Sequence, residues 1–270
     1  MRANFKHFRL LIALLLGSVI ALPGTPVRAD TPAASIPAGK FESVLPPAPG
    51  VKEVKVAAFL LDRTPVTNAQ FAKFVAAHPQ WRRDRVAAVF ADSGYLSHWQ
   101  SATEPGNALA RQPVVHVSWF AAKAYCEARG ARLPSWYEWE YAAAASETQA
   151  DARKDPAWRQ RILAWYSQSA RGSLPDVGQG AANFYGVHDL HGVVWEWVED
   201  LSAMLVSADN REQGDPDATR FCGSGALTME QKENYAILMR IAMLSSMQAS
   251  YTSSTMGFRC ASDLTGASTP

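Results

Sequence analysis

The spacing of apolar residues predicts a strand and then a helix where the patterned part of the chain begins. Residues 51–61 alternate between apolar and polar positions closely enough to form a β-strand. Thr67 and Gln70 then have the spacing of a capping box, in which each side chain accepts from the other residue's backbone N–H. A helix is expected to follow, with an apolar stripe made of Phe71, Phe74 and Val75.

Two more helices are predicted in the middle of the chain. Ser118 is a suitable N-cap for a helix that ends near Gly130, because a glycine can stop a helix in the left-handed conformation. Ser135 and Glu138 have the spacing of a second capping box, and the helix that it opens is expected to run to Ala145.

The remaining stretches lack such patterns. Proline, alanine, glycine and serine dominate the region before the first strand, and charged residues with alanine follow the third helix. We expect a flexible lead-in at 30–50, an exposed insertion at 146–161, irregular loops at 167–183 and 201–220, one or two closing strands within 239–261 and a disordered tail at 264–270. No linker interrupts residues 51–263, and nine tryptophans favour a single aromatic-rich, loop-rich domain over a helical bundle.

The first 29 residues have the three-part pattern of a secretory signal peptide. Basic residues precede an almost wholly apolar run at 10–22, and Val27 and Ala29 place small residues before a cleavage site. The apolar run is about 13 residues long, whereas a bilayer span needs about 20. We therefore expect export to the periplasm or secretion, with no membrane attachment after cleavage. A retained membrane anchor is the alternative.

Charge gives no sign of a polyanionic partner. The chain has 26 basic and 25 acidic residues, and the predicted leader holds four of the basic ones and no acidic one. Its removal leaves 22 basic against 25 acidic residues, a net charge of −3. That balance does not suggest binding to nucleic acid or to an anionic membrane surface.

The chain has three cysteines, Cys126, Cys222 and Cys260. In an oxidising compartment one disulfide is expected, which leaves one thiol over. The spacings do not fit a zinc site.

A series of motifs resembles the formylglycine-generating enzyme (sulfatase-modifying factor) family, in the family's order. They are DRTPVTNAQF at 62–71, PVVHVSW at 113–119, AYC at 124–126, RLP at 132–134, EWEYA at 138–142, NFYGV at 183–187, GVVWEW at 192–197 and GFRC at 257–260. The segment at 81–99 looks closest to exported bacterial relatives, which act in pyoverdine maturation or beside nitrite reductases. The resemblance implies an α+β fold, a variant of the C-type-lectin-like fold with little regular secondary structure.

The resemblance also implies a calcium site and a disulfide. The calcium ligands would be the side chains of Asp189 and Glu196 and the backbone carbonyls of Gly192 and Val194, an oxygen set that suits Ca²⁺. The alternative is that Glu196 binds backbone amides and that Asp189 is a turn residue. A second calcium site of the family needs an asparagine-rich segment that residues 165–182 lack. The implied disulfide joins Cys126 and Cys260, which leaves Cys222 free.

The family's copper chemistry uses two cysteines, and this chain has neither of them. The corresponding positions fall near Gln231 and Ala236, and no cysteine lies between 222 and 260. Glu230 and Glu233, which are three residues apart, could instead share one helical face and bind Fe(II). Histidine ligands for that ion would come from His98, His116, His188 or His191.

Each of these candidate groups has a structural alternative. Glu230 and Glu233 can simply face solvent, and His116 can be a hydrogen-bonded core histidine within an apolar strand. Cys222, between Phe221 and Gly223, is either a reactive thiol or a small buried apolar residue.

The motifs and the missing cysteines leave two candidate functions. The first is an exported maturation factor, a possible oxidoreductase, that assists the oxidation of a peptide-like substrate: a siderophore precursor or a partner metalloenzyme. The second is a non-catalytic, calcium-stabilised, lectin-like binding module.

Overall fold

A computed structural model describes residues 32–43, 45, 51, 53–167, 173–200, 240–244 and 246–264. The expected signal peptide at 1–29, the irregular loop at 201–220 and most of the tail at 264–270 lie outside these residues. So do Cys222, Glu230 and Glu233, together with the two positions that correspond to the family's copper cysteines.

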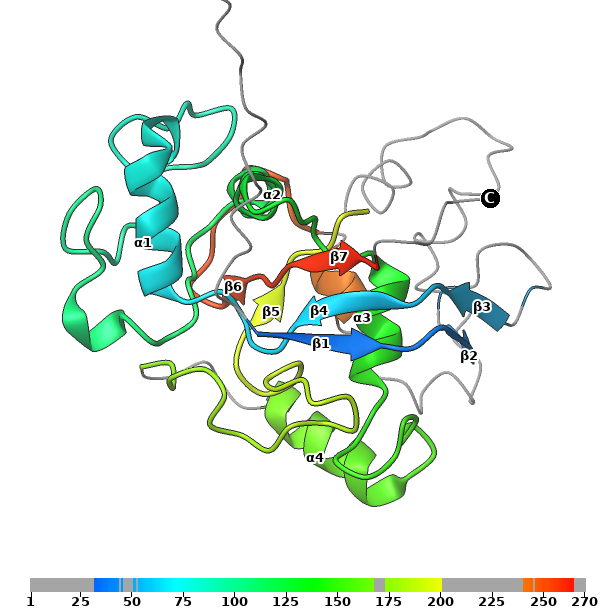
Figure 1. Ribbon diagram of the computed structural model, residues 1–270. Helices are drawn as coiled ribbons and strands as arrows, with labels where there is room; N and C mark the ends of the chain where they lie inside the picture. Colours follow the sequence, from blue (N-terminus) through cyan, green and yellow to red (C-terminus); the bar gives the residue numbers. More distant parts are fainter. Residues whose placement is uncertain are drawn as a thin grey trace, which may run out of the picture.

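A three-stranded antiparallel sheet joins the two ends of the described chain (Figure 1). Its strands are β1 (Ala33–Ile36), β4 (Phe59–Asp62) and β7 (Ala261–Asp263), in the order β1-β4-β7. The central strand β4 has Leu61 opposite Ala34 on one side and Ala261 on the other. A closing strand was predicted within 239–261, and β7 begins at the last of these positions and pairs with β4 near the start of the domain.

Two small strand pairs complete the described β-structure. β2 (Gly39–Glu42) pairs antiparallel with β3 (Glu53–Val56), and β5 (Trp195–Glu196) pairs parallel with β6 (Met256–Gly257). The single strand predicted at 51–61 is thus divided between β3 and β4. The prediction of a flexible lead-in at 30–50 is wrong for β1 and β2, because Ala34, Ile36 and Phe41 are buried in the core.

The predicted helices form at their predicted caps. α1 (Asn68–Ala77) begins after Thr67, and both halves of the capping box are present. α2 (Trp119–Ala128) begins after Ser118, and Gly130 beyond its end has a φ of 68°. α3 (Trp136–Ala143) begins after Ser135 with the second capping box complete, and ends two residues before the predicted position.

Further helical segments were not predicted. They are the short 3-10 helices η1 (Pro79–Trp81) and η2 (Asn107–Leu109), the helix α4 (Pro156–Ser167) and a helical stretch at 240–244. The expectation of an exposed insertion at 146–161 is wrong in part, because Ala152 and Trp158 are buried. The loop described at 173–183 is irregular, as predicted.

The core lies between the sheet and helices α1 to α3, and aromatic rings fill its centre. Phe71 of α1 contacts Tyr125 of α2 and Phe258, with ring centroids 5.7 Å and 6.0 Å away. Phe74 also packs against Tyr125, and Phe71 packs against Trp99. Segments far apart in the sequence therefore meet in one cluster, which fixes the loop that carries Trp99 against α1.

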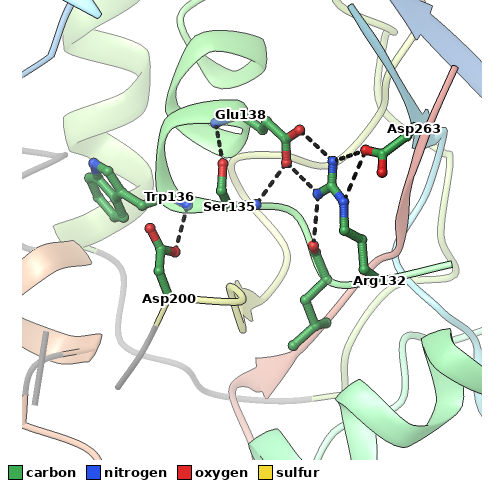
Figure 2. Close-up of polar contacts among 7 residues, drawn as sticks. Arg132, Ser135, Trp136, Glu138, Asp200 and Asp263 are labelled. Atoms are coloured by element: carbon green, nitrogen blue, oxygen red, sulfur yellow. Dashed lines mark hydrogen bonds and ion pairs between the residues drawn. The ribbon is translucent and has the colours of Figure 1, made fainter. Parts of the chain in front are cut away.

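An arginine links the start of α3 to the last strand (Figure 2). The guanidinium of Arg132 donates to both carboxylate oxygens of Glu138 at 2.6 and 2.7 Å and to Asp263 of β7 at 2.6 Å. Asp200 adds a contact at the same helix end, because it accepts from the backbone N–H of Trp136 at 2.7 Å. Carboxylates are favourable at this end because the first N–H groups of a helix have no partner within it.

Cys126 in α2 and Cys260 before β7 form a disulfide, with their Cα atoms 5.6 Å apart. The pairing implied by the family resemblance is thereby confirmed. The bridge joins residues 134 positions apart, so it fastens a central helix to the closing strand of the sheet.

Candidate functional site

The WEW and FRC segments meet in a buried ion pair. Glu196 of β5 and Arg259 are both 0% exposed, and Arg259 Nη2 lies 2.8 Å from Glu196 Oε1. Arg259 Nε donates to both carboxylate oxygens, and the indole of Trp139 donates to Oε2 at 2.9 Å. Arg259 also donates to the backbone carbonyls of Asp62 and His188. The pair therefore links four separate segments of the chain.

A second buried arginine extends this cluster. The guanidinium of Arg240 lies 3.6 Å from the ring centroid of Trp139 and donates to the backbone carbonyl of Glu196 at 2.5 Å. Such a cation–π contact gains strength when it is removed from water. Neither arginine was predicted from the sequence to take part in a site. A sequence signal for the buried pair was present, because Glu196 and Arg259 are each a charged residue between apolar neighbours.

Asp189 lies in the turn that precedes this cluster. Its φ is 60°, and one carboxylate oxygen accepts from the backbone N–H of Gly178 at 2.5 Å. Burial raises the pKa of Asp189, and the nearby carboxylate of Glu196 acts in the same direction, while Gly178 and Arg259 oppose it. The carboxylates of Asp189 and Glu196 are balanced in charge by the guanidinium groups of Arg259 and Arg240.

The family's calcium set can be compared with this geometry. Among the described residues, the carbonyls of Gly192 and Val194 accept no hydrogen bond, and neither does the second oxygen of Asp189. Carbonyl and carboxylate oxygens are the ligands that Ca²⁺ prefers. Glu196 fits less directly, because its carboxylate is already held by Arg259 and Trp139.

A cavity of about 140 Å³ lies beside the same turn, between α3, α4 and the segment around Asp189. Its polar lining residues include Ser146, Asn183 and the ion pair of Glu147 with Arg161. The cavity is large enough for a few water molecules or a small polar ligand.

The four histidines proposed as iron ligands separate into two groups. His188 pairs its Nδ1 with the carbonyl of Gly180, and His191 pairs its Nε2 with the carbonyl of Ala143, at 2.8 and 2.9 Å. His98 and His116 instead lie together, with ring centroids 5.0 Å apart. Burial lowers the pKa of His98 to about 4, with smaller effects of His116 and Arg83.

The expectation of a hydrogen-bonded core His116 within an apolar strand is wrong. His116 lies outside the strands with a φ of 54°, and its buried Nδ1 has no hydrogen-bond partner. Both ring nitrogens of His98 are likewise buried and unpaired. Burial lowers the pKa of His116, and Asp92 opposes that shift.

No group of three or more histidine, cysteine, aspartate or glutamate side chains able to hold a metal ion occurs among the described residues. Within the same residues, no helix combines the length and the apolar character needed to cross a bilayer.

The chain is similar to known proteins over most of its length. The family model of the sulfatase-modifying factor enzyme 1-like domain matches residues 21–264. The formylglycine-generating enzyme of Thermomonospora curvata is 29% identical over 266 residues, covering 79% of this chain and 84% of that protein. The inactive C-alpha-formylglycine-generating enzyme 2 of Bos taurus is also 29% identical, over 271 residues covering 84% of this chain and 86% of that protein.

Two solved structures have a similar fold. CarF superposes with a TM-score of 0.50 at 15% identity, covering 87% of this chain and 98% of that one. PvdO from Pseudomonas aeruginosa superposes with a TM-score of 0.48 at 20% identity, covering 86% and 94%. The likeness to CarF concerns the fold alone. The match over residues 21–264 shows that this chain belongs to the sulfatase-modifying factor enzyme 1-like family, which includes the formylglycine-generating enzymes.

Proposed function

We propose that this chain is an exported maturation factor that assists the oxidative modification of a peptide-like substrate, either a siderophore precursor or a partner metalloenzyme. The observation that carries the proposal is the match to a formylglycine-generating enzyme over 79% of this chain. Formylglycine formation is itself an oxidation of a protein side chain, so the family supplies the reaction class.

The reaction would need ligands other than a pair of thiolates. The chain has three cysteines, and the disulfide uses two of them, so Cys222 is the one that remains. A single chain therefore cannot supply the two free thiolates that suit Cu(I). We propose Cys222 and the carboxylates of Glu230 and Glu233 as the groups to test first in the segment where the family's cysteines would lie.

A non-catalytic function is the second candidate. The curated relatives include an inactive homologue from Bos taurus whose identity to this chain equals that of the bacterial enzyme. The buried Glu196–Arg259 pair and the disulfide could support a binding surface without any reaction. In this case the chain would be a calcium-stabilised module of the C-type-lectin-like type.

We further propose that Ca²⁺ binds at Asp189, Gly192, Val194 and Glu196. The oxygens of Gly192, Val194 and Asp189 that have no hydrogen-bond partner among the described residues support the site. The ion would supply positive charge to hold a turn that carries two left-handed residues, Asp189 at 60° and Gly192 at 101°. Its role would be structural under either candidate function.

Metal content and oxygen uptake separate the two functions. The chain without its leader should be purified, analysed for bound metals and then loaded anaerobically with Fe(II) or Cu(I). Oxygen uptake and peptide mass are then followed with two probes, a sulfatase-type peptide that contains cysteine and a tyrosine-containing siderophore-like peptide. The oxidation proposal expects uptake together with a mass change in one of these peptides.

The controls identify the groups involved. Cys222→Ser and the double variant Glu230→Gln/Glu233→Gln should reduce turnover, whereas Glu53→Gln, which alters an exposed ion pair with Lys40, should leave it unchanged. Peptide binding without oxygen uptake under every loading condition would favour the non-catalytic module.

A further inference from the structure

His98 and His116 come from separate loops that the backbone holds together. The N–H of Leu96 donates to the carbonyl of His116 at 2.9 Å, and the N–H of His116 donates to Ser253 at 2.8 Å. Leu96 and His116 both have left-handed backbone conformations, with φ of 47° and 54°. Non-glycine residues adopt this conformation only when the surrounding structure holds them there.

The two rings lack the hydrogen bonds that buried histidines normally make. Both nitrogens of His98 and Nδ1 of His116 are buried and have no partner. Buried polar atoms without partners are rare, and each one calls for an explanation such as an ion or a water molecule. Three such atoms in two adjacent rings indicate one common cause.

The space beside these rings is polar. A Cβ atom added at Gly94 would lie 2.6 Å from the Thr252 hydroxyl, 3.2 Å from a carboxylate oxygen of Asp92 and 3.9 Å from His116 Nδ1. Asp92 itself is fixed, since it accepts from the N–H of Gly94 and from the N–H and hydroxyl of Thr252. The carboxylate brings negative charge to the pair without occupying the ring nitrogens.

We propose that His98 and His116 are two ligands of a transition-metal ion. Imidazole nitrogen is a preferred ligand for copper, zinc and nickel. The ring centroids lie 5.0 Å apart, which is within the span that two imidazoles can bridge when both bind one ion at about 2.0–2.1 Å. No third histidine, cysteine, aspartate or glutamate among the described residues completes a set, so water or an added ligand fills the other positions.

This site is distinct from the calcium positions near Asp189. It uses soft-to-intermediate nitrogen ligands, whereas calcium takes oxygen. It also does not depend on the oxidation proposed above, because an ion at His98 and His116 could be structural. Failure of the peptide oxidation assays would leave this proposal standing, because metal binding at His98 and His116 is measured separately.

Calorimetric titration of the metal-free chain with Cu²⁺ and Zn²⁺, in excess Ca²⁺, tests the assignment. One ion per chain is expected, with copper bound more tightly than zinc. His98→Gln and His116→Asn should each weaken binding by about tenfold or more, since loss of even an outer-sphere group costs about that much. Asparagine is chosen at position 116 because it tolerates the left-handed backbone.

Two matched controls and a second measurement complete the test. His188→Gln and His78→Gln should keep the wild-type affinity, since their rings are paired with backbone carbonyls. If a variant fails to fold, X-ray absorption on the zinc-loaded wild type decides instead, with two imidazoles expected at the metal. Unchanged affinity in both folded ligand variants, or fewer than two imidazoles at the metal, overturns the proposal.

Discussion

Glu196 and Arg259 form an ion pair at 2.8 Å in which neither side chain is exposed to solvent. They lie 63 positions apart in the sequence. Both charges lie in the protein interior, away from water. Removing either partner would leave an uncompensated buried charge, which strongly destabilises the folded state.

Replacing Arg259 should therefore destabilise the fold strongly. Arg259→Met leaves the buried carboxylate of Glu196 without its cation, and we expect a loss of about 3–5 kcal/mol in the free energy of unfolding. Urea denaturation measures this loss. Arg111→Met is the matched control, because Arg111 is 78% exposed in its pair with Asp176 and should contribute at most about 1 kcal/mol. Equal effects of the two substitutions would contradict the buried role of Arg259.

The disulfide leads to a prediction about thiols and stability. Thiol titration of the unfolded, unreduced chain should find one thiol, and reduction should raise the number to three, because the chain has three cysteines. The double variant Cys126→Ala/Cys260→Ala should lose up to about 4–5 kcal/mol, as expected for a loop of more than 100 residues. A Cys222→Ser control should keep the wild-type stability. Three thiols before reduction would contradict the bridge.

Calcium should raise the melting temperature if the proposed site is correct. At a free concentration 100 times the dissociation constant, a ligand of the native state adds about 2.7 kcal/mol. Asp189→Ala should abolish that gain, whereas Asp176→Ala, in an exposed ion pair, should retain it. Differential scanning fluorimetry with calcium and with EGTA provides the comparison. A wild type that melts at the same temperature in both would exclude the site.

Acid should weaken the metal-free fold before its carboxylates titrate. Burial lowers the pKa of His98 and His191 from 6.5 to about 4. Between these values the unfolded chain binds protons that the native chain does not, so stability falls as the pH drops from 6.5 toward 4. The slope is at most about 1.4 kcal/mol per pH unit for each histidine.

Chemical denaturation at a series of pH values in EDTA measures this slope. His98→Gln should make the dependence shallower, since one of the two groups no longer titrates. The raised pKa values of Asp189 and Asp200 act in the opposite direction, because each native carboxyl group holds a proton that the unfolded form has already lost. A His98→Gln variant whose pH dependence between 6.5 and 4 equals that of the wild type would contradict the burial of His98.

Local contacts made parts of this structure predictable from the sequence. The capping boxes at Thr67 and Ser135 each link residues three positions apart, so their sequence signal is complete within one helical turn. The disulfide of Cys126 with Cys260 was implied by the family resemblance, and the structure confirms it. Because the chain has three cysteines and the disulfide uses two of them, Cys222 is the remaining free one, and this count needs only the sequence and the bridge.

Contacts between distant segments could not be derived in this way. β1 was missed because its strand signal is short and its partner β4 begins 23 positions after β1 ends. His98 and His116 each have an ordinary surrounding sequence, and only the turns around them bring the rings within 5.0 Å. The sequence by itself determined the family, the helix starts and the missing thiolate pair. The tertiary structure decided which charges and imidazoles meet, because burial and pairing over long sequence distances depend on how the whole chain packs.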